Sequence, residues 1–64
     1  MSVKLSLKAY RTNADKTQDD MAKMLNCHIQ TYRKLEHTPK MMTIEQAMKV
    51  CEYLGIPFDV KIFA

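Results

Sequence analysis

Apolar residues recur at helical spacing through the middle of this chain. Leu7, Tyr10 and Ala14 fall three or four positions apart, so they share one face of a helix. Ser6, immediately before them, is a residue type that caps helix N-termini well. The pattern therefore predicts a first helix from Leu7 to about Asn13.

Two short helices joined by a tight turn are predicted next. Thr17 is followed three positions later by Asp20, a capping signal that satisfies free N–H groups at a helix start and predicts a second helix over about 18–25. Asn26 tolerates the left-handed backbone conformation of many helix ends, so the chain can turn sharply into a third helix over about 28–37. The apolar faces of these two helices are formed by Met21, Ala22, Leu25, Tyr32 and Leu35. The arrangement is a helix-turn-helix.

A fourth helix follows a break at Thr38-Pro39, because the residue before a proline is pushed away from helical angles. Thr43 is its expected N-cap, with Gln46 in the first turn, and Gly55 is its expected end. The expected apolar stripe of this helix consists of Ile44, Ala47, Met48, Cys51 and Leu54.

The two ends of the chain show a different pattern. Residues 2–7 and 58–63 alternate between apolar and polar positions, which is typical of short β-strands. Such strands could pair with each other or with those of a second subunit, and loosely held tails are the alternative. Residues 1–64 are therefore expected to form a single, mainly α domain of four helices, with short strands at both termini.

Composition excludes several classes of protein. Apolar residues make up 47% of the chain and there is one Gly, which favours a folded helical unit over a disordered chain. No apolar run approaches the length of a membrane span, and the N-terminus lacks the features of a signal peptide. We expect a soluble, cytoplasmic protein without a membrane partner.

No metal or cofactor is expected. Cys27 and Cys51 are too few and too far apart for a disulfide framework, and both are expected to be reduced, small core residues. A metal site would have to combine them with His28 and His37, but these four residues lack the short paired spacings of zinc ligands.

Charge points to an anionic partner. The chain carries ten Lys and Arg against seven Asp and Glu, a net charge of +3. The predicted third helix has a polar and basic outer side. An enzyme is not expected, because no nucleophile, base and orienting group can be assembled and no glycine-rich phosphate loop occurs.

The order and spacing of these signals resemble the Cro and phage-repressor family of helix-turn-helix proteins. The resemblance implies a four-helix, λ-repressor-like domain that binds a palindromic operator in double-stranded DNA as a homodimer and regulates transcription. An opening Leu-Lys-Ala-x-Arg-x-Asn looks especially like small phage-encoded regulators, which implies a phage or prophage origin. The matching residues are Leu7-Lys8-Ala9-Tyr10-Arg11, Thr17-Gln18 with Ala22 and Leu25, Thr31 with Leu35-Glu36, and Leu54-Gly55-Ile56.

The resemblance also implies which residues meet DNA. The start of the third helix would reach base edges, where Gln30 could pair with adenine, Lys34 with guanine and Ile29 with a thymine methyl group. His28, at the start of the same helix, would also reach a base edge. Phosphate contacts are implied for Gln18 at the start of the second helix and for Thr31, Arg33 and Lys40. The expected DNA-binding residues are Gln18, His28, Ile29, Gln30, Thr31, Arg33, Lys34 and Lys40.

Each of these roles has a simpler alternative. Gln18 could be a solvated residue of a first helical turn, and Ile29 could belong to the core. His28 could cap its helix rather than contact DNA. Arg33 and Lys34 could form an ordinary solvated face.

Arg11 and Glu36 are expected to have a structural role. In the family these positions form a partly buried ion pair that ties the first helix to the third. Two residues depart from the family pattern, because Asp15 and Thr38 stand in loops where Gly is usual. Both loops are therefore expected to take unusual paths.

A second function remains open, that of an antitoxin-like module that grips another protein. Flexible methionines suit adaptable binding surfaces, and this chain has six of them. An exposed cluster of Met24, Met41 and Met42 would favour this alternative. A bare basic face on the third helix would count against it.

Overall fold

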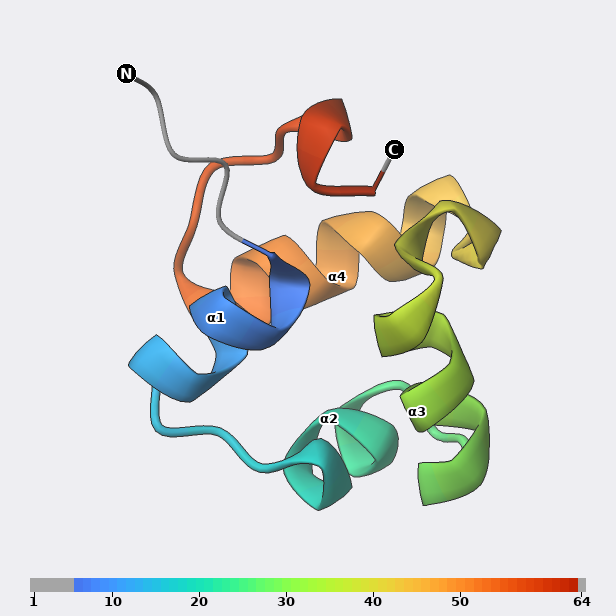
Figure 1. Ribbon diagram of the computed structural model, residues 1–64. Helices are drawn as coiled ribbons and strands as arrows, with labels where there is room; N and C mark the ends of the chain where they lie inside the picture. Colours follow the sequence, from blue (N-terminus) through green and yellow to red (C-terminus); the bar gives the residue numbers. More distant parts are fainter. Residues whose placement is uncertain (1–5, 64) are drawn as a thin grey trace.

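Four α-helices and two short 3-10 helices follow one another in residues 6–63, the part of the chain that the computed structural model describes (Figure 1). The predicted four-helix, mainly α fold is confirmed, and residues 6–63 contain no strand. The alternating pattern of residues 2–5 lies outside the described residues. The elements are α1 (Leu7–Asn13), α2 (Gln18–Met24), α3 (Ile29–His37), η1 (Pro39–Met41), α4 (Ile44–Leu54) and η2 (Val60–Phe63).

Three helices begin at the caps that the sequence predicts. The Ser6 hydroxyl accepts a hydrogen bond from the first turn of α1. Thr17 and Asp20 exchange side-chain and backbone hydrogen bonds of 3.0 and 2.9 Å at the start of α2, and Thr43 and Gln46 do the same at α4. The Thr17 N–H, by donating to the Asp20 carboxylate, holds the pKa of that carboxyl below its usual value. These reciprocal bonds fix where α2 and α4 start.

Three helices end in the same left-handed turn. Asp15, Asn26 and Gly55 have φ angles of 58°, 56° and 69°. In each case the N–H of the following residue donates to the carbonyl five positions earlier, at 3.2, 2.9 and 3.0 Å. Asp15 therefore adopts the conformation that suits Gly, and the turn after α1 does not take an unusual path. Thr38, at the end of α3, has φ −130° and leads directly into η1.

The core lies where the helices meet. In Figure 1, α2 and α3 lie beside each other and α4 runs across the other side of the domain. Tyr32 has the largest side chain among the fully buried residues. The buried apolar residues are Leu7, Met21, Ala22, Tyr32, Leu35, Ala47, Val50, Cys51, Leu54 and Phe63.

The predicted stripe of α4 is partly wrong. Ile44 is 66% exposed and Met48 is 55% exposed, whereas Val50, which the stripe did not include, is fully buried. The inward positions are Ala47, Val50, Cys51 and Leu54, spaced as i, i+3, i+4 and i+7. Ile44 and Met48 lie on one flank of this face, since they are four positions apart and turned away from its centre.

The predicted C-terminal strand is also wrong, because Val60–Phe63 form the 3-10 helix η2. The Asp59 carboxylate accepts a 2.9 Å hydrogen bond from the Lys61 N–H, a local turn that competes with extended structure. The turn buries Phe63 in the core and leaves Val60 exposed. The aromatic ring of Phe63 stacks on Phe58 with centroids 6.0 Å apart.

A buried ion pair ties α1 to α3, as the family resemblance implies. The Arg11 guanidinium donates to both carboxylate oxygens of Glu36, at 2.8 and 3.2 Å, and the two side chains are only 9% and 6% exposed. A third N–H of Arg11 donates to the carbonyl of Lys16 at 2.7 Å, in the turn that leads to α2. One side chain therefore connects α1, α3 and the start of α2.

Tyr32 packs in the centre of the fold as an essentially apolar ring. Its hydroxyl is the one buried side-chain polar atom in residues 6–63 that has no hydrogen-bond partner. Burial, reinforced by the neighbouring Glu36 carboxylate, raises the pKa of Tyr32 far above its usual range. The phenol is therefore neutral under all ordinary conditions.

Breaking the ion pair from one side should destabilise the fold severely. In Arg11→Ala, the Glu36 carboxylate stays buried without its partner, so we expect the free energy of unfolding to fall by about 3–5 kcal/mol. That loss is large for a chain of this size, whose total stability is ~3–10 kcal/mol. Urea denaturation followed by circular dichroism measures it.

The matched control is Lys8→Ala, which removes an exposed cation from the same helix and should change stability by less than about 0.5 kcal/mol. The double variant with Arg11→Met and Glu36→Leu should recover most of the loss, since no charge is left buried. An Arg11→Ala protein as stable as the parent would refute the role of the pair.

Candidate nucleic-acid interface

The outer side of α3 carries a row of polar side chains. Gln30, Lys34 and His37 are exposed and are spaced as i, i+4 and i+7, so they form one ridge along the helix. The opposite side of α3 holds Tyr32 and Leu35, which are buried as predicted. His37 was not among the expected site residues, although its spacing from Lys34 places it on the same ridge.

Arg33 lies on the flank of this ridge that faces α2. Its Nε–H donates to the side-chain oxygen of Gln18, the first residue of α2, at 3.2 Å. The Gln18 amide in turn donates to Glu36 over a longer distance of 3.5 Å. Gln18 is half-buried and does not stand free in solvent. Thr31 is also exposed on α3.

The two residues at the start of α3 differ in exposure. His28 occupies the N-cap position, but its exposed side chain makes no hydrogen bond to the first turn of the helix, all of which is described. The capping alternative for His28 is therefore not supported. Ile29 is half-buried and packs against the core, which favours the alternative that it is a core residue.

Lys40 lies apart from these residues. It is exposed in η1, beyond the far end of α3.

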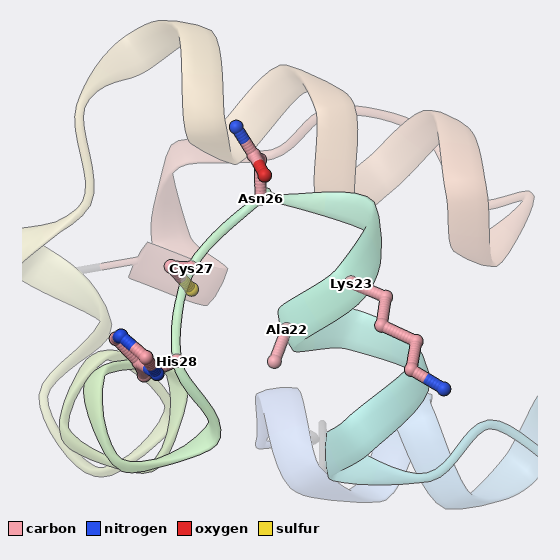
Figure 2. A pocket seen from close by; sticks show the side chains of 5 residues that line it. All are labelled: Ala22, Lys23, Asn26, Cys27 and His28. Atoms are coloured by element: carbon pink, nitrogen blue, oxygen red, sulfur yellow. The ribbon is translucent and has the colours of Figure 1, made fainter.

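A shallow hollow opens at the turn between α2 and α3 (Figure 2). Ala22 points into the gap between the two helices, whereas the long side chain of Lys23 extends outward along α2. The N–H of Cys27 donates to the carbonyl of Ala22 at 2.9 Å, which closes the turn around Asn26. A small residue at position 22 thus lets the start of α3 approach α2 closely.

A second hollow lies between α3 and η1 and continues the exposed ridge. The surface exposed to this hollow is mainly apolar, although its lining residues include two basic side chains and an imidazole and no carboxylate. The lining residues are Arg33, Lys34, His37, Thr38 and Met41.

Other kinds of site have little support in the described residues. Residues 6–63 contain no group of three or more His, Cys, Asp or Glu side chains placed to hold a metal ion. Cys51 is buried, and burial raises the pKa of its thiol, which fits the expected packing role. Cys27 is half-buried and packs beside the core. None of the described helices is long and apolar enough to span a bilayer.

Comparison with known proteins identifies the family. The sequence profile of a family described as helix-turn-helix matches residues 7–61, which include all four α-helices. No curated protein and no solved structure matches the chain. The match covers most of the sequence, and the geometry of α2 and α3 agrees with it. The chain therefore belongs to the helix-turn-helix family of DNA-binding regulators, of the Cro and phage-repressor type.

Proposed function

We propose that this protein is a transcriptional repressor that occupies a palindromic operator as a homodimer. The observation that carries the proposal is the exposed polar ridge of α3, which stands opposite the buried Tyr32 and Leu35. A helix with this division of faces can enter the major groove while its other side holds it in the fold. The likeness of residues 7–13 to phage-encoded regulators supports a phage or prophage origin and action in a bacterial cytoplasm.

Two side chains of the ridge are proposed to read bases. Gln30 presents an amide that can pair bidentately with adenine, and Lys34 can donate to guanine. His28 is exposed at the end of the helix nearest the turn, where it can reach a base edge or a phosphate. Ile29 contributes at most its exposed edge to a thymine methyl group, because it packs against the core.

The residues around the ridge are proposed to bind phosphates. Thr31 and Arg33 flank the ridge, and Lys40 lies beyond its end in η1. Cationic and hydroxyl side chains placed on both sides of a groove-binding helix fix its register on the duplex without reading sequence. Gln18 stands next to Arg33 at the start of α2 and belongs to the same contact.

An exposed apolar surface beside η1 is proposed as the dimer interface. Ile44 and Met48, one turn apart on α4, are 66% and 55% exposed, and Met41 in the preceding η1 is 65% exposed. Contiguous exposed apolar side chains mark contact sites on small proteins, and we propose that these three form one. Since η1 follows directly on α3, a second copy seated here would bring two α3 ridges into one assembly. A palindrome requires two such ridges one helical turn of DNA, ~34 Å, apart.

The antitoxin alternative loses its main support in the structure. Met24 and Met42 are half-buried against the core, so only Met41 of the three methionines is largely exposed. The basic side of α3 is exposed, with Arg33 and Lys34 turned to solvent. Met24, Met41 and Met42 therefore do not form an exposed cluster, whereas the exposed Met41 and Met48 belong to the proposed dimer interface.

Selection of bound sequences from random duplex DNA tests the proposed readout. The parent should enrich a palindrome whose half-sites lie about 10 bp apart. Gln30→Ala should relax the preference at an adenine, and Lys34→Ala should relax it at a guanine. Each loss should be worth about 1–3 kcal/mol of discrimination at that position only.

Lys49→Ala is the matched control, because it removes an exposed lysine from α4, away from α3, and should leave the selected motif unchanged. Failure of the parent to enrich any motif would refute sequence-specific binding. A motif that survives both α3 substitutions unaltered would refute the readout by Gln30 and Lys34.

Ile44→Lys tests the dimer interface, because it places a charge in the centre of the apolar surface. Sedimentation on duplexes with one or two half-sites should show that the parent loads a full site as a dimer. The variant should bind a single half-site as the parent does but lose cooperative loading of the second. Glu52→Lys, an exposed position on the same helix, is the control and should keep cooperativity. Undiminished cooperativity in Ile44→Lys would move the interface elsewhere.

A further inference from the structure

Gln18 stands between two charged groups of α3. Its side-chain oxygen accepts a hydrogen bond from the Nε–H of Arg33, and its side-chain nitrogen lies 3.5 Å from a carboxylate oxygen of Glu36. Arg33 and Glu36 are three positions apart, so they project from neighbouring turns of α3. The amide therefore bridges the start of α2 to α3.

These two neighbours permit only one orientation of the Gln18 amide. If the amide were reversed, its oxygen would face the Glu36 carboxylate and its NH₂ group would face the Arg33 guanidinium, and both contacts would be repulsive. Glu36 is itself fixed by the two hydrogen bonds from Arg11. The buried ion pair thus sets the direction of the amide, and the amide sets where Arg33 finds its acceptor.

The Arg33 guanidinium uses few of its N–H donors in hydrogen bonds to the described part of the protein. A guanidinium has five N–H donors, and within residues 6–63 only the Nε–H of Arg33 donates to a protein acceptor. The side chain is exposed and borders the hollow between α3 and η1, next to the exposed Lys34. A guanidinium held at one edge and open at the other is well placed for bidentate contact with a phosphate.

We propose that Arg33 is the principal phosphate-binding side chain at the junction of α2 and α3, and that Gln18 acts through it as a positioning residue. The order Arg11, Glu36, Gln18, Arg33 forms one chain of contacts from the buried ion pair to the DNA backbone. Gln18 orients the guanidinium before DNA arrives, which reduces the side-chain entropy lost on binding. The proposal rests on the proposed binding of DNA by this protein.

A double-mutant cycle on the full chain tests the proposal. The affinity for the selected duplex is measured over a range of salt concentrations for the parent, Gln18→Met, Arg33→Ala and the double variant. Arg33→Ala should weaken binding about fivefold near physiological salt and make the logarithmic salt slope less steep by about 0.9, the effect of one lost phosphate contact. Gln18→Met keeps the side-chain shape but removes both hydrogen bonds. It should weaken binding in the parent and have almost no effect once Arg33 is gone, a coupling of about twofold or more.

Independent losses would overturn the proposal, because they would make Gln18 a separate DNA contact. An Arg33→Ala protein with parental affinity and salt slope would also overturn it. In either case the parent still binds the duplex, so the proposed function stands. Absence of binding by the parent would instead refute the proposed function itself. Lys49→Ala is the control for loss of a surface charge and should leave the salt slope unchanged.

The free protein provides a second readout that does not depend on DNA. In the parent, the arginine Nε–H resonance of Arg33 should be resolved and protected from exchange with water, since Gln18 accepts this hydrogen bond. Gln18→Met should abolish the protection and leave the Arg11 resonance protected by its bonds to Glu36. Equal exchange of the Arg33 Nε–H in both proteins would contradict the positioning role.

Discussion

The Arg11–Glu36 ion pair is the interaction on which the rest of this structure depends. It is bidentate, almost entirely buried, and extended by a third bond from Arg11 to the turn before α2. Desolvating two charges costs several kcal/mol each, so such a pair contributes less to net stability than its geometry suggests. The pair matters because it orients its neighbours. Two apolar side chains could fill the same space, but they could not orient the Gln18 amide as the Glu36 carboxylate does.

The helices α2 and α3 depend on such tertiary contacts for their placement, because both are short. Helices of seven and nine residues are marginal alone, and most of their stability comes from packing and from their ends. The ends of α1, α2 and α4 are fixed by left-handed turns at Asp15, Asn26 and Gly55. Together with the small, buried Ala22 between α2 and α3, these turns hold α3 with one side in the core and the other in solvent.

Much of this arrangement could be predicted from the sequence, because it depends on local chemistry. Caps at Ser6, Thr17 and Thr43 follow from hydrogen bonds between residues three positions apart. The ion pair followed from a family resemblance. The rest depends on tertiary context: the bridge from Gln18 to Arg33 joins residues 15 positions apart and leaves no periodic signal in the sequence.

The wrong predictions have a similar cause. The alternation of residues 58–63 was opposed by a turn at Asp59 that the hydrophobic pattern does not register. The stripe of α4 included Ile44 and Met48 because they are apolar, but the rotation of a helix is decided by what it packs against. Both residues are exposed instead, and they belong to the surface that we propose as the dimer interface.

We propose that DNA meets the outer side of α3 while the ion pair holds the other side in place. Titration of the ¹⁵N-labelled protein with the selected duplex, followed by amide chemical shifts, is the decisive measurement. We expect the largest shifts over residues 28–34 and at Gln18 and Lys40, with little change over residues 49–53 of α4. Shifts centred on α4, or none in α3, would contradict it.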